Sequence, residues 1–341
     1  MKEPIKLIGN VASPYTRKMV AYLRYKRIPY EVIWGQPEDV LKEMNIEPPK
    51  PILLPVFILD REGQATAVTD STPLIREFEE KYPDRSVLPK DPALNFINFI
   101  LEDFGDEWCT KFMFHYRWHF EEDADNAGTI LPLGINSALK DDELAFFKEH
   151  FAKRQIDRLW VVGSNDDTAE FIDQSYKNVL SIFEDHFKNH SFLLGNFPSS
   201  CDFAVYGQFT QLVGFDPTPR RIAHEISPRT VAYVNTLDDR GGLDYVEENN
   251  TIDSLSNSIH DLFKELATSY VPTMIENHKA IREGKKEWSV DLAGYPWKQK
   301  SFPYQAKCLD WIRDEFRDLD NENQAKVLSF LTANNCQSLV E

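Results

Sequence analysis

The sequence contains neither a long apolar run nor clustered cysteines, and these absences exclude several classes of protein. No uninterrupted apolar segment approaches the roughly 18 residues that a membrane-spanning helix requires. The four cysteines are Cys109, Cys201, Cys308 and Cys336, and no two of them form a C-x-x-C pair. This spacing argues against a zinc knuckle and against a dithiol redox motif, so we expect reduced, mostly buried thiols.

Positive charge is also in short supply. The 341 residues include 55 acidic and 38 basic side chains, which gives a net charge of −17. A field of this sign repels phosphate backbones and anionic lipid surfaces, so a nucleic-acid or membrane partner is disfavoured. The first residues, MKEPIKLIGN, lack the apolar core of a signal peptide, and we expect a soluble, cytoplasmic protein.

Motifs of several common enzyme classes are missing. The chain has neither a phosphate-binding glycine loop nor a Ser-His-Asp order, which removes the nucleotide and hydrolase interpretations. His115, His119 and Glu122 have a spacing that would bring three metal ligands to one helix face. Because no fourth ligand accompanies them, we predict no metal site.

The pattern that is present indicates two domains of different class. Apolar runs at 5–8, 30–34, 52–60 and 65–69 predict strands, and helical patterns cover 14–26, 38–45 and 70–83. This β-α-β-α-β-β-α order predicts a mixed four-stranded sheet with helices around it. We place this α/β domain at residues 1–85.

A charged, proline-containing segment, 84–93, predicts a linker, and beyond it the strand signal nearly vanishes. Helical spacing recurs at 94–120, 141–160, 168–189, 200–213, 255–281 and 304–334. We therefore predict an all-α domain over residues 92–341, with a long C-terminal extension. Its aromatic-rich segment 287–316 is expected to wrap this domain, and closure over a cleft is the alternative.

Ser13 is the first residue that allows both a structural and a chemical interpretation. With Pro14 behind it, Ser13 makes a sound helix N-cap, because serine satisfies an orphan N–H and proline has none to lose. The same hydroxyl can donate to a thiolate held at the helix N-terminus, where the dipole favours an anion.

Two further features also allow both a structural and a chemical interpretation. Pro55 inside a strand implies an edge, a bulge, or a cis Leu54–Pro55 bond that turns the Leu54 backbone toward a bound peptide. Asp70 and Ser71 either cap a helix or bind the ammonium and carboxylate of an α-amino acid head group.

The three features occur in the order found in one family, and residues 4–89 resemble the thioredoxin-like domain of cytosolic glutathione transferases of the Ser-type, bacterial-like kind. The resemblance implies that Ser13 activates the glutathione sulfur as the catalytic residue. It also implies that Leu54, before a cis-proline at Pro55, binds the cysteinyl backbone and that Asp70 and Ser71 bind the γ-glutamyl group. The segment 195-GNFPSSCDFAVYGQF-209 resembles the family's buried capping box, with Ser199 and Asp202 as its pair.

Two more residues join this expected glutathione site. The family has a lysine close before the cis-proline, and Lys50 is its counterpart here, although 51-PILL-54 separates Lys50 from Pro55. Asn10 lies near the expected thiol position, and its amide can share or replace the role of Ser13.

The run 108-WCTKFMFHYRWHFEED-123 carries several aromatic residues that cannot all face one way. They pack in a core or interface, or they line a pocket. The resemblance implies a pocket for the second substrate at this helix, and we assign Trp108, Phe112 and Tyr116 to it.

The resemblance as a whole implies a glutathione transferase that uses glutathione as cosubstrate, needs no metal, conjugates a small apolar electrophile and forms a homodimer. One alternative is a non-catalytic binding or interaction protein of the same fold. Another is a glutathione-dependent reductase or isomerase.

Overall fold

The N-terminal elements follow the predicted order in the computed structural model, which describes residues 3–246 and 248–341. The elements are β1 (Ile5–Gly9), α1 (Pro14–Lys26), β2 (Tyr30–Trp34), α2 (Pro37–Glu43), β3 (Val56–Arg61), β4 (Gln64–Val68) and α3 (Ser71–Lys81). The sheet order is β2-β1-β3-β4, with β1 and β2 parallel and the other pairs antiparallel. The α/β fold class predicted for this part is therefore confirmed.

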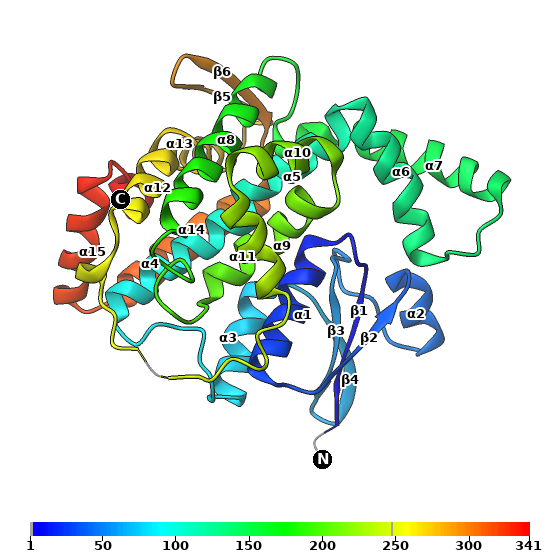
Figure 1. Ribbon diagram of the computed structural model, residues 1–341, viewed down its shortest axis with the longest axis horizontal. Helices are drawn as coiled ribbons and strands as arrows, with labels where there is room; N and C mark the ends of the chain where they lie inside the picture. The colour runs from blue at the N-terminus through cyan, green and yellow to red at the C-terminus, as the bar shows by residue number, and fades with distance from the viewer. Residues whose placement is uncertain (1–2, 247) are drawn as a thin grey trace.

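Strand β1 is the centre of this sheet and is covered on both faces. Neighbouring residues of a strand point to opposite faces, yet Leu7 and Ile8 are both fully buried. Leu7 belongs to the main hydrophobic core, whereas Ile8 packs with Leu41 of α2 and with Val56. Helices α1 and α3 lie on one side of the sheet and α2 lies on the other (Figure 1). The end of β1 is thus held rigidly from both sides.

The rest of the chain is mostly helical, as predicted. Its helices are α4 (Pro92–Asp103), α5 (Cys109–His119), α6 (Glu121–Ile135), α7 (Asp141–Ile156), α8 (Ala169–His186), α9 (Ser200–Gly214), α10 (Pro217–Ile226), α11 (Pro228–Leu237), α12 (Asn257–Thr268), α13 (Tyr270–Arg282), α14 (Pro303–Asp318) and α15 (Asn321–Ala333). A π-helical turn, Phe104–Trp108, joins α4 to α5. Residues 82–91 contain neither helix nor strand, and the domain limits 1–85 and 92–341 stay a prediction.

One element corrects the all-helical prediction for the second part. Strands β5 (Glu287–Leu292) and β6 (Tyr295–Lys300) form an antiparallel hairpin. Its loop, Ala293–Gly294, has positive φ at both residues, which suits a two-residue turn between twisted strands. Trp288 and Leu292 are buried, whereas the residues between them alternate toward solvent. This period of two was the strand signal in the sequence.

Three helices were not predicted, and each contains residues that usually break or begin helices. Helix α6 includes Gly128 and Pro132, and α10 and α11 each begin with a proline that looks like a joint in the sequence. Helices α6 and α7 together extend away from the other helices, above α2 (Figure 1). Within the described residues, no helix has both the length and the apolar character needed to cross a membrane.

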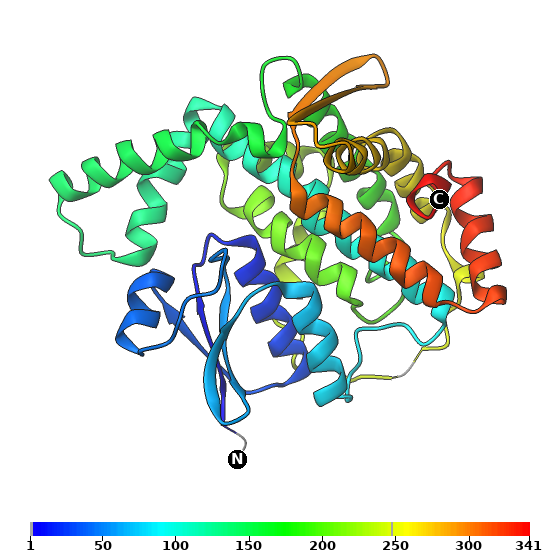
Figure 2. The same cartoon turned by 180° about the vertical axis from the view of Figure 1, so that it is seen from behind.

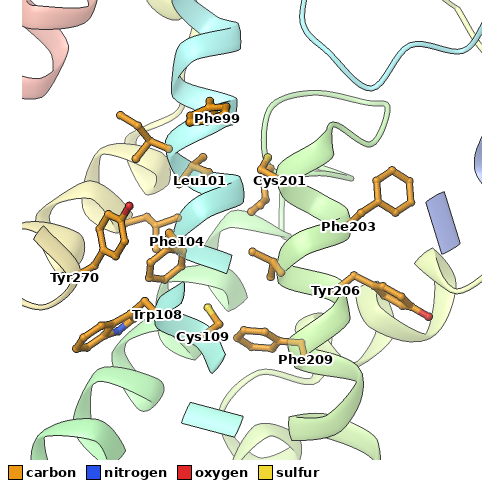
Figure 3. Close-up of a cluster of buried hydrophobic side chains, with 14 of the residues drawn as sticks. Phe99, Leu101, Phe104, Trp108, Cys109, Cys201, Phe203, Tyr206, Phe209 and Tyr270 are labelled. Atoms are coloured by element: carbon orange, nitrogen blue, oxygen red, sulfur yellow. The ribbon is translucent and has the colours of Figure 1, made fainter. Parts of the chain in front are cut away.

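Helix α9 lies between the α/β part and the helical part and packs against both. It packs against α1 on one side and against α4 and α5 on another. Figure 3 shows the packing against α4 and α5, with Cys201 and Phe209 of α9 facing that side. A Cβ atom on Gly207 would lie only 2.6 Å from the Pro14 carbonyl oxygen, so glycine permits the start of α1 to approach α9 closely.

Replacing Gly207 by alanine is expected to destabilise the protein by about 1–3 kcal/mol, because the added methyl group pushes α1 away from α9. Urea unfolding of the whole chain measures the change. Gly214→Ala, at the last residue of α9 and without a neighbouring atom within 4 Å, is the matched control and should be neutral. Equal effects of the two substitutions would contradict the close approach as the cause.

Candidate functional site

Strand register brings most of the expected glutathione-binding residues to one edge of the sheet. Ile8 of β1 lies opposite Val56 of β3, and Phe57 lies opposite Val68 of β4. Because β3 is antiparallel to both neighbours, the residues that precede β3 meet those that follow β1 and β4. The residues gathered at this edge are Asn10, Leu54, Pro55 and Asp70.

Ser13 lies at the start of α1 and acts as its N-cap. Its hydroxyl oxygen accepts the backbone N–H of Thr16 at 3.2 Å, and Pro14 occupies the first helical position. An oxygen that accepts one hydrogen bond still carries its own proton for donation. Among the described residues, no acceptor takes that proton. The half-buried Ser13 can therefore cap α1 and donate to a ligand at the same time.

Asn10 shapes the loop that leads to Ser13. Its side-chain oxygen accepts the N–H of Ala12 at 2.9 Å, and its backbone oxygen accepts the N–H of Ser13 at 3.0 Å. The guanidinium of Arg117 donates to the Ala12 carbonyl at 3.2 Å and fixes the loop from the helical side. The amide oxygen of Asn10 is thus already engaged, and its amide NH2 group is left for a ligand.

The Leu54–Pro55 bond is cis, and it lies just before the start of β3. Leu54 stands beyond the last paired residue of β3, and among the described residues its backbone makes no hydrogen bond. Its N–H and C=O are thus available to an extended peptide. Lys50 also precedes a cis-proline, Pro51; it is exposed, and its ammonium has no ion-pair partner in the described part of the chain.

Asp70 and Ser71 stand at the N-terminus of α3, but Asp70 does not cap this helix with its side chain. Its φ of 85° lies in the left-handed region, and its carboxylate accepts the hydroxyl of Tyr304 at 3.0 Å. The Ser71 oxygen accepts the ammonium of Lys18 at 3.0 Å. As with Ser13, this leaves the hydroxyl proton of Ser71 free to donate to a ligand carboxylate.

Lys18 was not predicted, yet it connects the two parts of the chain beneath this site. Its side chain is 1% exposed, and its ammonium contacts Glu102 at 3.0 Å and Asp106 at 2.6 Å. Arg76 of α3 approaches the other Glu102 oxygen at 2.8 Å. We call Lys18, Ser71, Arg76, Glu102 and Asp106 the Lys18 network. No local pattern in the sequence marks Lys18, because Ser71 and Asp106 lie 53 and 88 residues away from it.

The pKa values of the carboxyl groups in and beside this network are shifted in opposite directions. Burial raises the pKa of Asp103 to about 7, of Asp106 to about 6 and of Glu107 to about 8, and neighbouring acidic groups add to the shift. Burial alone would raise the pKa of Glu102 too, but Arg76 and Lys18 lower it to about 2. The pKa of Lys18 is raised because Asp106 and Glu102 outweigh its burial.

We expect the free energy of unfolding to rise as the pH falls from about 8 to about 5. In this window Asp103, Asp106 and Glu107 hold protons in the folded chain that the unfolded chain releases, because their folded-state pKa values are raised. His115 and His186 act in the opposite direction below about pH 6.5, because burial lowers their pKa values to about 3 and about 4, but these two groups do not outweigh the three carboxyl groups. Below about pH 4.5 the direction reverses, since folded Glu102 stays ionised while the unfolded chain takes up that proton. Urea titrations at constant ionic strength over this pH range measure both limbs.

Glu107→Gln should flatten the limb between about pH 5 and pH 8, because it removes one of the titrating groups. Glu80→Gln, on the exposed face of α3, is the matched control and should leave the profile unchanged. A parent protein that is as stable at pH 8 as at pH 5 would refute the expected profile.

The structure corrects the assignment of Trp108, Phe112 and Tyr116 to a substrate pocket. All three side chains are fully buried. They recur every four residues and form one stripe of the helix, which packs into the core against Tyr176 and other aromatic rings. Figure 3 shows Trp108 within the buried cluster. Of the alternatives for this run, core packing is the observed one.

His115, His119 and Glu122 do not form a metal centre. A hydrogen bond of 2.8 Å joins the Nδ1 atom of His115 to Ser164, and its ring stacks on His119. Burial and the neighbouring His119 lower the pKa of His115 to about 3. Glu122 is exposed. Across the described residues, no group of three or more His, Cys, Asp or Glu side chains could hold a metal ion.

The predicted capping box is confirmed at the start of α9. The Ser199 backbone N–H donates to the Asp202 carboxylate at 2.8 Å, and the reciprocal bond of the box is also present. Asp202 further accepts the Leu193 N–H and the Tyr233 hydroxyl. The four cysteines, too, are buried and free.

The sequence model of the glutathione S-transferase N-terminal domain matches residues 7–86. For residues 7–86, this match bears out the resemblance that Ser13, Leu54–Pro55 and Asp70–Ser71 carry. Among curated proteins, no sequence matches the chain.

The chain also shows low similarity to solved structures, three of which follow. The beta-etherase LigF of Sphingobium sp. strain SYK-6 is 19% identical, with a TM-score of 0.48 over 70% of this chain and 96% of its own. A glutathione transferase family member of Pseudomonas fluorescens pf-5, with two glutathione bound, is 14% identical, with a TM-score of 0.45 over 70% and 92%. FzlA of C. crescentus is 15% identical, with a TM-score of 0.41 over 70% and 89%. These likenesses are too distant to say what this chain binds.

Proposed function

We propose that this protein is a glutathione transferase, with Ser13 as the residue that stabilises the glutathione thiolate. The observation that carries the proposal is the hydrogen bonding of Ser13: its oxygen caps α1, and its proton remains available at the helix N-terminus. A hydroxyl donor and a helix N-terminus both favour an anion and so lower the pKa of a bound thiol.

Glutathione would bind along the edge of the sheet described above. The Leu54 backbone pairs with its cysteinyl part, the Ser71 hydroxyl donates to the γ-glutamyl carboxylate, and Asp70 accepts the α-ammonium. The Lys18 ammonium supports this assignment, because its hydrogen bond uses the Ser71 oxygen as an acceptor and leaves the Ser71 hydroxyl proton for a ligand. Asn10 and Lys50 are the remaining proposed contacts.

The proposed reaction is nucleophilic substitution or addition on a small apolar electrophile. The thiol proton goes to solvent and the sulfur forms a bond to an electrophilic carbon. In a substitution the leaving group departs with the electron pair of its bond to that carbon. In an addition the π-bond breaks, its electron pair moves to the neighbouring atom, and that atom takes up a proton from solvent. Val11, in the loop that leads to Ser13, is an apolar side chain with 49% exposure, which supports an apolar second substrate. Holding both reactants together supplies the rest of the rate gain.

A cytoplasmic location and a homodimer belong to the same proposal. The acidic net charge of −17 supports the absence of a nucleic-acid or lipid-surface partner. Equilibrium sedimentation of the full chain tests the dimer directly, since a monomer at micromolar concentration would rule it out.

Ser13→Ala is expected to raise the pKa of bound glutathione's thiol by about one unit, because one hydrogen bond to the thiolate is lost. Calorimetry measures binding, and the ultraviolet absorbance of the thiolate across pH measures that pKa. Ser13→Thr keeps both the cap and the hydroxyl and is the control, with an unchanged thiol pKa.

A parent protein that fails to bind glutathione at millimolar concentration would refute the proposal and favour a non-catalytic interaction protein. Binding with a normal thiol pKa in both parent and Ser13→Ala would leave Ser13 as a helix cap only. Turnover of disulfide or isomerisable substrates in place of conjugation would favour the reductase or isomerase alternative.

A further inference from the structure

Tyr304 connects the C-terminal extension to the site at Asp70. Its hydroxyl donates to one carboxylate oxygen of Asp70 at 3.0 Å, although 234 residues separate the two in sequence. Among the described residues, this is the hydrogen bond that the Asp70 side chain makes, since it does not cap α3. The carboxylate is therefore oriented by Tyr304 and not by its own helix.

The segment that carries Tyr304 is clamped in place. Asn277 is fully buried; its amide NH2 donates to the Phe302 carbonyl at 2.9 Å, and its amide oxygen accepts the Phe302 N–H at 2.8 Å. The indole N–H of Trp288 donates to the same amide oxygen at 3.1 Å. Pro303 then begins α14 with its φ restricted by the ring. Tyr304 follows directly on this fixed anchor.

Helix α14 is also buried along one face. Cys308 is 3% exposed, and Leu309 and Ile312 are fully buried. This face packs on α4, and Figure 2 shows the two helices side by side. Displacing α14 would expose these apolar side chains to water and is therefore unfavourable. Tyr304 thus belongs to the fixed wall of the site and not to a mobile cover.

We infer that Tyr304 is a positioning residue of the glutathione site, supplied by the C-terminal extension. The phenol holds one oxygen of Asp70, so that the second oxygen faces the α-ammonium of the ligand. The inference rests on the proposed function and deepens it, because it makes the extension part of the γ-glutamyl subsite. Tyr304 acts through Asp70, and its effect should depend on the ligand's ammonium group.

The test compares two ligands by calorimetry on the full chain: glutathione, and its deaminated analogue in which hydrogen replaces the α-amino group. Tyr304→Phe is expected to weaken glutathione binding about fivefold and to leave the analogue unchanged, because only the ammonium uses Asp70. In an Asp70→Asn background, Tyr304→Phe should have no further effect on glutathione. The matched control is Tyr295→Phe, which removes the hydroxyl of a tyrosine in the β5–β6 hairpin that donates to Glu170. This substitution should leave the affinity for both ligands unchanged.

Each other outcome overturns the inference. Equal glutathione affinity in parent and Tyr304→Phe would remove Tyr304 from the site and leave the proposed function intact. Tighter binding by the variant would make Tyr304 a competitor of the ammonium, and equal weakening of both ligands would make its role purely structural. A parent that binds neither ligand would refute the proposed function together with this inference. If Tyr304→Phe does not fold, Tyr304→Leu also removes the phenol hydroxyl and should show the same selective loss of glutathione binding.

Discussion

The buried ammonium of Lys18 is the interaction on which the arrangement of the site depends. It contacts Ser71 of α3 and also Glu102 and Asp106 of the helical part, so one charge joins three segments that are distant in sequence. Removing one member of a buried ion network leaves an uncompensated charge, which typically costs about 3–5 kcal/mol. Lys18 lowers the pKa of both Glu102 and Asp106, and Arg76, which lowers that of Glu102 further, accounts for the opposite net directions of the two carboxyl groups.

The helical part contributes to the site as much as the α/β domain does. Arg117 fixes the loop before Ser13 through the Ala12 carbonyl, and Tyr304 fixes the carboxylate of Asp70. Helix α9 determines where α1 begins, since Gly207 lets the Pro14 backbone come close. Ser13 and Asp70 are therefore positioned by residues of the helical part, which follows them in the chain.

The α/β domain was predictable because its signals are local. Alternating apolar residues, helix caps and turn glycines specify β1 to α3 without reference to the rest of the chain. The helical part was predicted less completely. Pro132 lies inside α6, and β5 and β6 lie in a domain that is predicted to be all-α, although their period of two is visible in the sequence. The stripe of Trp108, Phe112 and Tyr116 has the same spacing whether it faces a core or a pocket, so sequence could not separate the two.

The sequence by itself determined the class of the N-terminal domain and the order of Ser13, Leu54–Pro55 and Asp70–Ser71 within it, because these depend on local backbone preferences and on strand order. Only the tertiary structure decided which charges are buried together and which distant side chains reach the site. Lys18 and Tyr304 have no local pattern that marks them, since their roles depend on partners 53 and 234 residues away. Contacts of that range follow from packing, and packing is a property of the folded chain as a whole.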